Sequence, residues 1–307
     1  MITSIFSKSK PINFLVVFVI VMIAFSVAEI KFSNSTFEVD EILVQGFTFF
    51  FCLITIFLLN FVVSKNSLTK KNNYEILLFS LFLLLLPQTV LNWKIVLSNF
   101  FVLLSLRRMI SLRSQKNIMK KLFDAAFWIG IAALFNFWSI LFFVVIMAAL
   151  VFYSETNLKY WIIPYTGLTT VFLLATAFSI LYWGDLYWFQ KLNYYVNFDF
   201  SNYNSIHFVL AVTVLLSFGI WSSVFYLLNI KSKMKTLKPG FKIVLIAFLI
   251  ALVLVVISPY KQGNEFLFLF APLSIILTNY IETIKEKWFK ELFLTTFIVL
   301  PIVLLML

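Results

Sequence analysis

The chain alternates between long apolar runs and short polar segments, and this alternation predicts membrane-spanning helices. The first run, from about residue 11 to residue 30, is long enough to span, because about 20 residues at about 1.5 Å each match a hydrocarbon core of about 30 Å. No small-residue cleavage site follows it, which favours a retained first helix. Further spans are predicted at 43–63, 76–92, 95–111, 161–182, 206–229, 243–258, 266–281 and 292–307.

The region 122–153 is too long for one ordinary span and short for two. Asn136 and Ser139 interrupt its apolar run near the middle. We predict a hairpin that enters and leaves on the same side, with arms that are either two tilted spans or a re-entrant pair. The predicted fold class is therefore all-α, a polytopic integral membrane protein with about eleven transmembrane segments.

The positions of Lys and Arg predict the orientation. With a hairpin at 122–153, 20 of the 24 basic residues fall on the side of the N-terminus. The four others are Lys31, Lys94, Lys191 and Lys261. Because Lys and Arg are retained in the cytoplasm, this predicts a cytoplasmic N-terminus and an external C-terminus. The expected location is the bacterial inner membrane.

Composition supports the same class. The chain is 62% hydrophobic and only 12% charged, which leaves too little polar material to cover a soluble globule. Its net charge of +11 lies at the ends of apolar runs, so we exclude nucleic acid as a partner and expect membrane lipid. We predict a single transmembrane domain, 1–307, with a helical core at about 11–182, an external aromatic segment at 183–205 and C-terminal helices at 206–307.

Three carboxylates stand close together where the first external loop meets the second helix: Glu38, Asp40 and Glu41. Asp40 and Glu41 suit the positive end of the helix dipole, so a capping role is one interpretation. The other is that a carboxylate held at the membrane surface acts as general base toward a hydroxyl. No metal site or cofactor is predicted, although Asp40 with Glu38 or Glu41 offers oxygen ligands that suit Mg²⁺ or Mn²⁺.

Several features in this order resemble the polytopic C-type glycosyltransferases, which include protein O-mannosyltransferases and lipid A aminoarabinose transferases. They are the acidic pair Asp40-Glu41, the segment from Pro87 to Arg107-Arg108, the hairpin from Asp124 to Tyr153 and the late turn from Ser258-Pro259-Tyr260-Lys261-Gln262 to Pro272. Together they cover most of the chain. The chain is also similar to uncharacterised polytopic bacterial inner-membrane proteins.

The resemblance implies transfer of a sugar from a polyprenyl-phosphate donor to an acceptor at the external face. It implies Asp40 as the catalytic base with Glu41 as its neighbour. Lys94 and Lys261, in two other external turns, would then bind the donor phosphate. Alternatively, the two lysines are interfacial anchors. Gln262 is a candidate for binding sugar hydroxyls, or else a turn former.

The segment 183–205 is rich in aromatic residues, which favours an amphipathic interfacial helix or an aromatic belt. Asp185 within it is a candidate substrate-binding residue that would border an acceptor groove. The lone His207 is interpreted as an interfacial residue rather than a ligand.

Two other function classes stay open. The small loops and many Phe residues fit a noncatalytic membrane subunit of an envelope export or assembly complex, with partner membrane proteins. The third candidate function is a transporter. It is disfavoured because the sequence has no evident internal repeat and its charges lie at the span edges.

Overall fold

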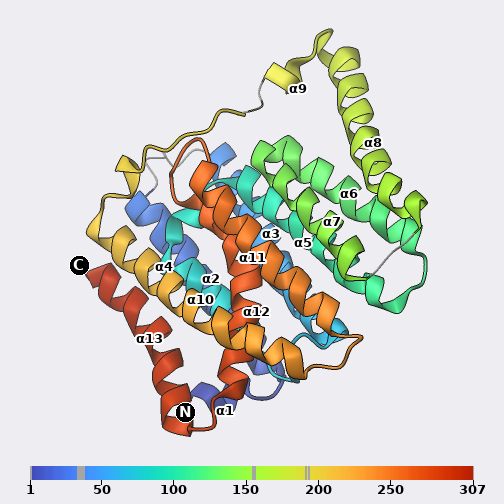
Figure 1. Ribbon diagram of the computed structural model, residues 1–307. Helices are drawn as coiled ribbons and strands as arrows, with labels where there is room; N and C mark the ends of the chain where they lie inside the picture. The colour runs from blue at the N-terminus through green and yellow to red at the C-terminus, as the bar shows by residue number, and fades with distance from the viewer. Residues whose placement is uncertain (1, 33–38, 154–156, 191, 193, 307) are drawn as a thin grey trace. The chain divides into compact units, whose positions relative to one another are not determined.

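The computed structural model describes residues 2–32, 39–153, 157–190, 192 and 194–306 (Figure 1). The described residues form helices and connecting segments, with no strand among them. Seven helices within these ranges are long and apolar enough to cross a membrane. They are Pro11–Phe32, Asp40–Asn66, Trp93–Ser114, Leu158–Trp183, Ile206–Ser232, Lys238–Ile257 and Asn264–Thr283. The all-helical fold is thus confirmed, and the count of eleven spans stays a prediction.

The chain divides into two compact units, each of which is described here by itself. Unit 1 comprises residues 1–96, 199–233 and 261–307. Its elements are α1 (Ile2–Phe6), α2 (Pro11–Phe32), α3 (Val39–Asn66), α4 (Tyr74–Leu85), η1 (Pro87–Val90), η4 (Ser201–Tyr203), α10 (Ile206–Ser232), η5 (Asn264–Phe266), α12 (Leu267–Thr283) and α13 (Lys287–Met306).

Two helices form the core of unit 1. Every residue of α4 is buried, and so is α12 from Leu267 to Ile281. These helices pack against each other, α4 also contacts α2, α3 and α13, and α10 packs on α12. The ring of Phe82 in α4 lies 5.5 Å from that of Phe270 and 5.6 Å from that of Phe297. With 12 residues, α4 is only about 18 Å long, so it is a core helix that its neighbours enclose.

Unit 2 comprises residues 97–198 and 234–260. Its elements are most of α5 (Trp93–Ile110), then η2 (Ser111–Ser114), α6 (Ile118–Phe135), η3 (Phe137–Phe142), α7 (Phe143–Phe152), α8 (Leu158–Trp183), α9 (Tyr187–Gln190) and α11 (Lys238–Ile257). Helices α6 and α8 cross closely because two glycines face the partner helix. A Cβ on Gly130 would lie 2.9 Å from the Val171 side chain, and one on Gly167 would lie 2.7 Å from the Phe123 carbonyl oxygen.

The predicted break at Asn136 and Ser139 is confirmed. Helix α6 ends at Phe135 with Asn136 as its C-cap, a 3₁₀ turn follows, and α7 packs back against α6. Ser139 is fully buried, and its hydroxyl lies 2.6 Å from that of Ser98 in α5. A buried hydroxyl requires a hydrogen-bond partner, so the pair of serines fixes the turn against α5.

The segment 183–205 differs from the predicted amphipathic helix. Its described part contains only the four-residue α9 and the three-residue η4, joined by a stretch without regular structure. Most of its aromatic side chains are exposed, including Tyr194 at 65% and Phe198 at 66%. Gly184, with φ of 74°, ends α8 and directs the chain out of the helix, which explains why helix does not continue.

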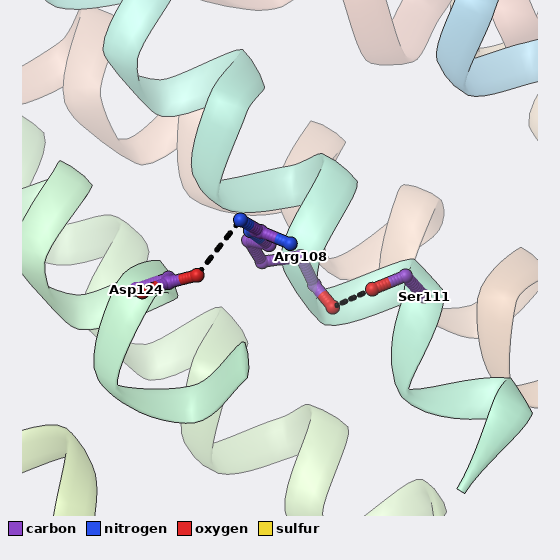
Figure 2. A network of polar contacts seen from close by, with 3 residues as sticks. All are labelled: Arg108, Ser111 and Asp124. Atoms are coloured by element: carbon purple, nitrogen blue, oxygen red, sulfur yellow. Dashed lines mark hydrogen bonds and ion pairs between the residues drawn. The ribbon is translucent and has the colours of Figure 1, made fainter. Parts of the chain in front are cut away.

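An ion pair links α5 to α6 in unit 2. Arg108 Nη2 lies 2.8 Å from Asp124 Oδ2, and Figure 2 shows Ser111 donating to the Arg108 carbonyl rather than to either charged group. Because both side chains are about a third exposed, solvent weakens their attraction.

We therefore expect Asp124→Asn to lower the free energy of unfolding by less than about 1 kcal/mol. Thermal unfolding of the purified variant in detergent checks this value. A loss above about 3 kcal/mol would instead indicate that the pair behaves as a buried one.

Candidate functional site

Two adjoining cavities lie at one end of unit 1. The first has a volume of about 360 Å³ and combines apolar side chains from α4 and α13 with polar side chains from four other segments. Its lining residues are Lys31, Phe32, Leu84, Leu85, Leu86, Pro87, Gln88, Asn202, Ser205, His207, Phe208, Gln262, Pro301 and Leu304. A cavity with an apolar wall and several polar groups is suited to an amphipathic molecule.

The second cavity has a volume of about 570 Å³ and a more polar lining. It is lined by Phe32, Gln88, Leu91, Asn92, Trp93, Lys94, Gln262 and Asn264. It shares Phe32, Gln88 and Gln262 with the first, so the two cavities adjoin. Both volumes fall in the range of about 300–1,000 Å³ that is usual for small-molecule sites.

Pro87 explains how Gln88 comes to line both cavities. Proline disfavours helix in the residue before it, and Leu86 has φ −126° and ψ 74°. Helix α4 therefore stops at Leu85, and the chain continues as the turn η1, which packs against α2 and η5. The predicted span 76–92 is thus a short helix plus a 3₁₀ turn.

The start of α5 presents Lys94. The Asn92 side-chain oxygen accepts from the Lys94 backbone N–H at 3.1 Å and from that of Ile95 at 3.4 Å, which is the usual cap of a helix start. Lys94 itself is exposed, and its Nζ lies 5.7 Å from the centre of the Trp93 ring. The structure thus brings two of the predicted substrate-binding residues, Lys94 and Gln262, to one cavity.

A constrained turn holds Gln262 at the surface. Its neighbours Lys261 and Gly263 have φ of 45° and 89°, which L side chains rarely adopt. The Glu265 Oε1 atom accepts from the Gly263 N–H at 3.2 Å, and both residues are buried. The other oxygen, Oε2, is buried without a hydrogen-bond partner among the described residues. Gln262 is exposed between these buried neighbours.

Lys261, a predicted phosphate ligand, is 0% exposed. Its Nζ lies 4.7 Å from the centre of the Phe200 ring, a cation–π distance. Burial lowers the pKa of Lys261, because the charged form is removed from water. In this conformation the ammonium does not reach the cavities, so a contact with phosphate requires the side chain to move.

Asp40 and Glu41 lie in the first turn of α3. Asp40 is exposed, whereas Glu41 Oε2 is buried and has no hydrogen-bond partner in the part of the chain that the structure describes. The carbonyl of Leu68, just beyond the last residue of α3, accepts from Asn279 near the end of α12. Because α12 begins next to the cavities, this contact lies at the far end of unit 1 from them. The first turn of α3 is therefore at the cavity end of unit 1, but neither carboxylate lines the two cavities. Glu38 lies outside the described residues.

Asp185 belongs to unit 2, where its contacts are local. Its carboxylate accepts from the Leu186 N–H at 2.5 Å and from Gln190 Nε2 at 3.0 Å. Its carbonyl oxygen accepts from the Ser179 hydroxyl at 2.5 Å. These bonds organise the turn after α8, so the observed role of Asp185 is structural.

Sequence reasoning assigned no role to Gln88, Asn92, Asn202 or Glu265, and it interpreted His207 as an interfacial residue. Gln88, Asn92, Asn202 and His207 line the cavities. Among these residues, the sequence offered a local indication only for Gln88. Pro87 marks the end of a helix, and therefore a change of chain direction next to Gln88. In the described ranges, no group of three or more His, Cys, Asp or Glu side chains is arranged to hold a metal ion.

Over residues 1–306 the chain matches a family described as "Family of unknown function (DUF6427)", and it belongs to that family. No curated protein and no solved structure matches it. The match covers residues of both units, and the description of the family assigns no activity.

Proposed function

We propose that this chain is a membrane glycosyltransferase that takes a sugar from a polyprenyl-phosphate donor and passes it to a hydroxyl at the external face. The single observation that carries the proposal is the pair of adjoining cavities, one with a wall of Leu and Pro side chains and the other with a cation and amides. A lipid-linked phosphosugar has the same division into an apolar chain, an anionic group and a ring of hydroxyls.

The proposed topology has about eleven spans, a cytoplasmic N-terminus and an external C-terminus, in a bacterial inner membrane. It is supported by the charge distribution, with Lys31, Lys94 and Lys261 the basic residues near the cavity end. The opposite end of unit 1 carries lysines such as Lys70 and Lys290. Retention of Lys and Arg in the cytoplasm then orients the cavities outward.

In the proposed reaction, the Asp40 carboxylate accepts the proton of the acceptor hydroxyl as its oxygen attacks the anomeric carbon of the sugar. The bond between that carbon and the phosphate oxygen breaks, and the polyprenyl phosphate leaves with the electron pair. Lys94 offsets the negative charge that develops on the phosphate. Gln262 and Asn264 donate to and accept from sugar hydroxyls, since amides can do both.

We expect Lys94→Gln to weaken binding of polyprenyl phosphate about tenfold, the usual consequence of losing one hydrogen bond to a charged group. The measurement is titration of the full chain in lipid nanodiscs with polyprenyl phosphate. Lys159→Gln is a matched control, because it removes the same charge from the start of α8 in unit 2. Polyprenol of equal length should bind less tightly than the phosphate. Equal affinity for the two lipids would contradict the proposal.

A second candidate function is a noncatalytic membrane subunit of an envelope assembly. The observation that favours it is that neither Asp40 nor Glu41 is among the residues that line the two cavities. The two functions are distinguished by purification from its native membrane under mild conditions. A subunit is recovered with partners in fixed stoichiometry, and the isolated chain transfers no sugar.

A further inference from the structure

Two polar side chains at the start of α4 are buried, and their polar atoms find no partner in other residues that the structure describes. Asn73 is 1% exposed and Glu75 is 0% exposed. Both polar atoms of the Asn73 amide lack a partner among the described residues, and so do both carboxylate oxygens of Glu75 beyond the N–H of its own residue. Asn73 occupies the cap position of α4, yet its side chain makes no cap bond.

These orphaned atoms are energetically costly. A buried amide without a partner loses its bonds to water without replacement, and a buried carboxylate without a counter-charge is more costly still. Buried polar groups in native proteins are satisfied in the great majority of cases, and an exception points to a water molecule or an ion. Two adjacent exceptions, one of them a carboxylate, point to an ion.

More orphaned oxygens lie on the helices that pack against α4. Asn13 Oδ1 in α2 and Thr278 Oγ1 in α12 are both buried and without a partner in the described part of the chain. The Asn73 N–H donates to the Phe6 carbonyl at 3.0 Å, which ties the start of α4 to the segment just before α2. The Tyr74 hydroxyl donates to the Thr3 carbonyl in α1, and α1 packs against α13. Asn279, next to Thr278, donates to the carbonyl of Leu68, which shortly precedes α4. All four side chains therefore lie toward the same end of unit 1.

The half-buried carboxylates at this end, Glu282 and Glu291, are already compensated. Glu282 Oε1 accepts from the Lys70 N–H and from Asn72 Nδ2, each at 2.6 Å, and Lys70 and Lys233 attract its charge. Lys290 also lies near Glu282. Glu291 accepts hydrogen bonds from the hydroxyl and the backbone N–H of Thr3. Glu75 differs from them, because within the described ranges neither of its oxygens has a partner outside its own residue.

We propose that the start of α4 binds one monovalent cation of the size of Na⁺, held by the Glu75 carboxylate with oxygens of Asn73, Asn13 and Thr278. One cation balances the single negative charge of Glu75, whereas a divalent ion would leave a buried positive charge. Carboxylate, amide and hydroxyl oxygens are the hard ligands that such ions take. The site is at the end of unit 1 opposite the two cavities, so it is independent of the proposed glycosyl transfer.

The test measures the melting temperature of the purified full chain in detergent as the NaCl concentration is raised. The added NaCl replaces choline chloride at each step, so the ionic strength stays constant. We expect the melting temperature to rise saturably, on the order of 5 °C from sodium-free to saturating conditions, because an ion that binds only the folded chain stabilises it. Glu75→Gln should abolish this rise. Glu286→Gln is the matched control, because the same change at an exposed residue after α12 should leave the rise intact.

A melting temperature that is insensitive to Na⁺ in the wild-type chain overturns the proposal, since it indicates a Glu75 that is simply protonated. Stabilisation by Ca²⁺ but not by Na⁺ overturns the monovalent assignment. If Glu75→Gln does not fold, binding of radioactive ²²Na⁺ to the wild-type chain decides: saturable binding near one ion per chain supports the site, and its absence rejects it.

Discussion

Replacing Asp40 with Asn is expected to reduce the rate of sugar transfer by roughly 10²–10⁴-fold, the usual contribution of a general base. The reason is that an amide cannot accept the proton of the acceptor hydroxyl. The measurement is transfer of a labelled sugar from a polyprenyl-phosphate donor by the full chain in nanodiscs. The expected loss is in kcat, whereas donor binding should be unchanged, because Asp40 does not line either cavity.

The location of Asp40 makes this variant interpretable. Asp40 is exposed in the first turn of α3, so its replacement leaves no buried group unsatisfied. Loss of its charge from the helix start should cost only about 0.3–1 kcal/mol of stability. Asp124→Asn, the same change at a residue of unit 2, is the control. Transfer at the wild-type rate by a folded Asp40→Asn protein would reject the proposed base and leave the subunit as the better function.

Replacing Gly263 with Ala is expected to lower the free energy of unfolding by about 2–5 kcal/mol. A residue with a Cβ pays about 1–2 kcal/mol for the left-handed backbone that Gly263 adopts at φ of 89°. Its Cβ would also lie 2.7 Å from Phe208 Cε2 and 3.0 Å from two atoms of Gln88, and such overpacking costs about 1–3 kcal/mol. Denaturant unfolding of the purified chain measures the sum.

Gly184 offers a matched control for this prediction. Its φ is 74°, but a Cβ there would meet nothing within 4 Å. Gly184→Ala should therefore cost only the backbone part, about 1–2 kcal/mol. Equal losses for the two variants would show that the contacts with Phe208 and Gln88 carry no strain. Because those two residues line the first cavity, Gly263→Ala should also weaken lipid binding, whereas Gly184→Ala should not.

The sequence predicted helix type and helix breaks well where the cause is local. Asn136 and Ser139 interrupt an apolar run, and the structure breaks the hairpin there. Gln262 was a candidate because the late turn that contains it resembles that of the glycosyltransferases, and it lines both cavities. Backbone restrictions and the cost of polar groups in apolar runs act within a few residues, so a single sequence reports them.

Burial was less accessible to prediction because it depends on distant segments. Lys261 looked like an accessible loop lysine, but it packs over Phe200, which is 61 residues earlier in the chain. Glu75 directly precedes the predicted span 76–92, where a charge is expected to be exposed, yet it is completely buried. The segment 183–205 has the composition of an interfacial helix. However, Gly184 ends α8 in the left-handed conformation, and the local hydrogen bonds of Asp185 form a turn there.

The enclosure of α4 has a consequence for biosynthesis. A helix this short that contacts protein on every side gains nothing from bilayer insertion by itself, and its start carries Asn73 and Glu75. Two of the helices that pack against it, α12 and α13, are translated after its other partners α2 and α3. A nascent chain halted before this point would leave the two polar side chains facing lipid. Ribosome stalling or C-terminal truncation should thus yield a product that membrane proteases degrade, even though most of its helices are already inserted.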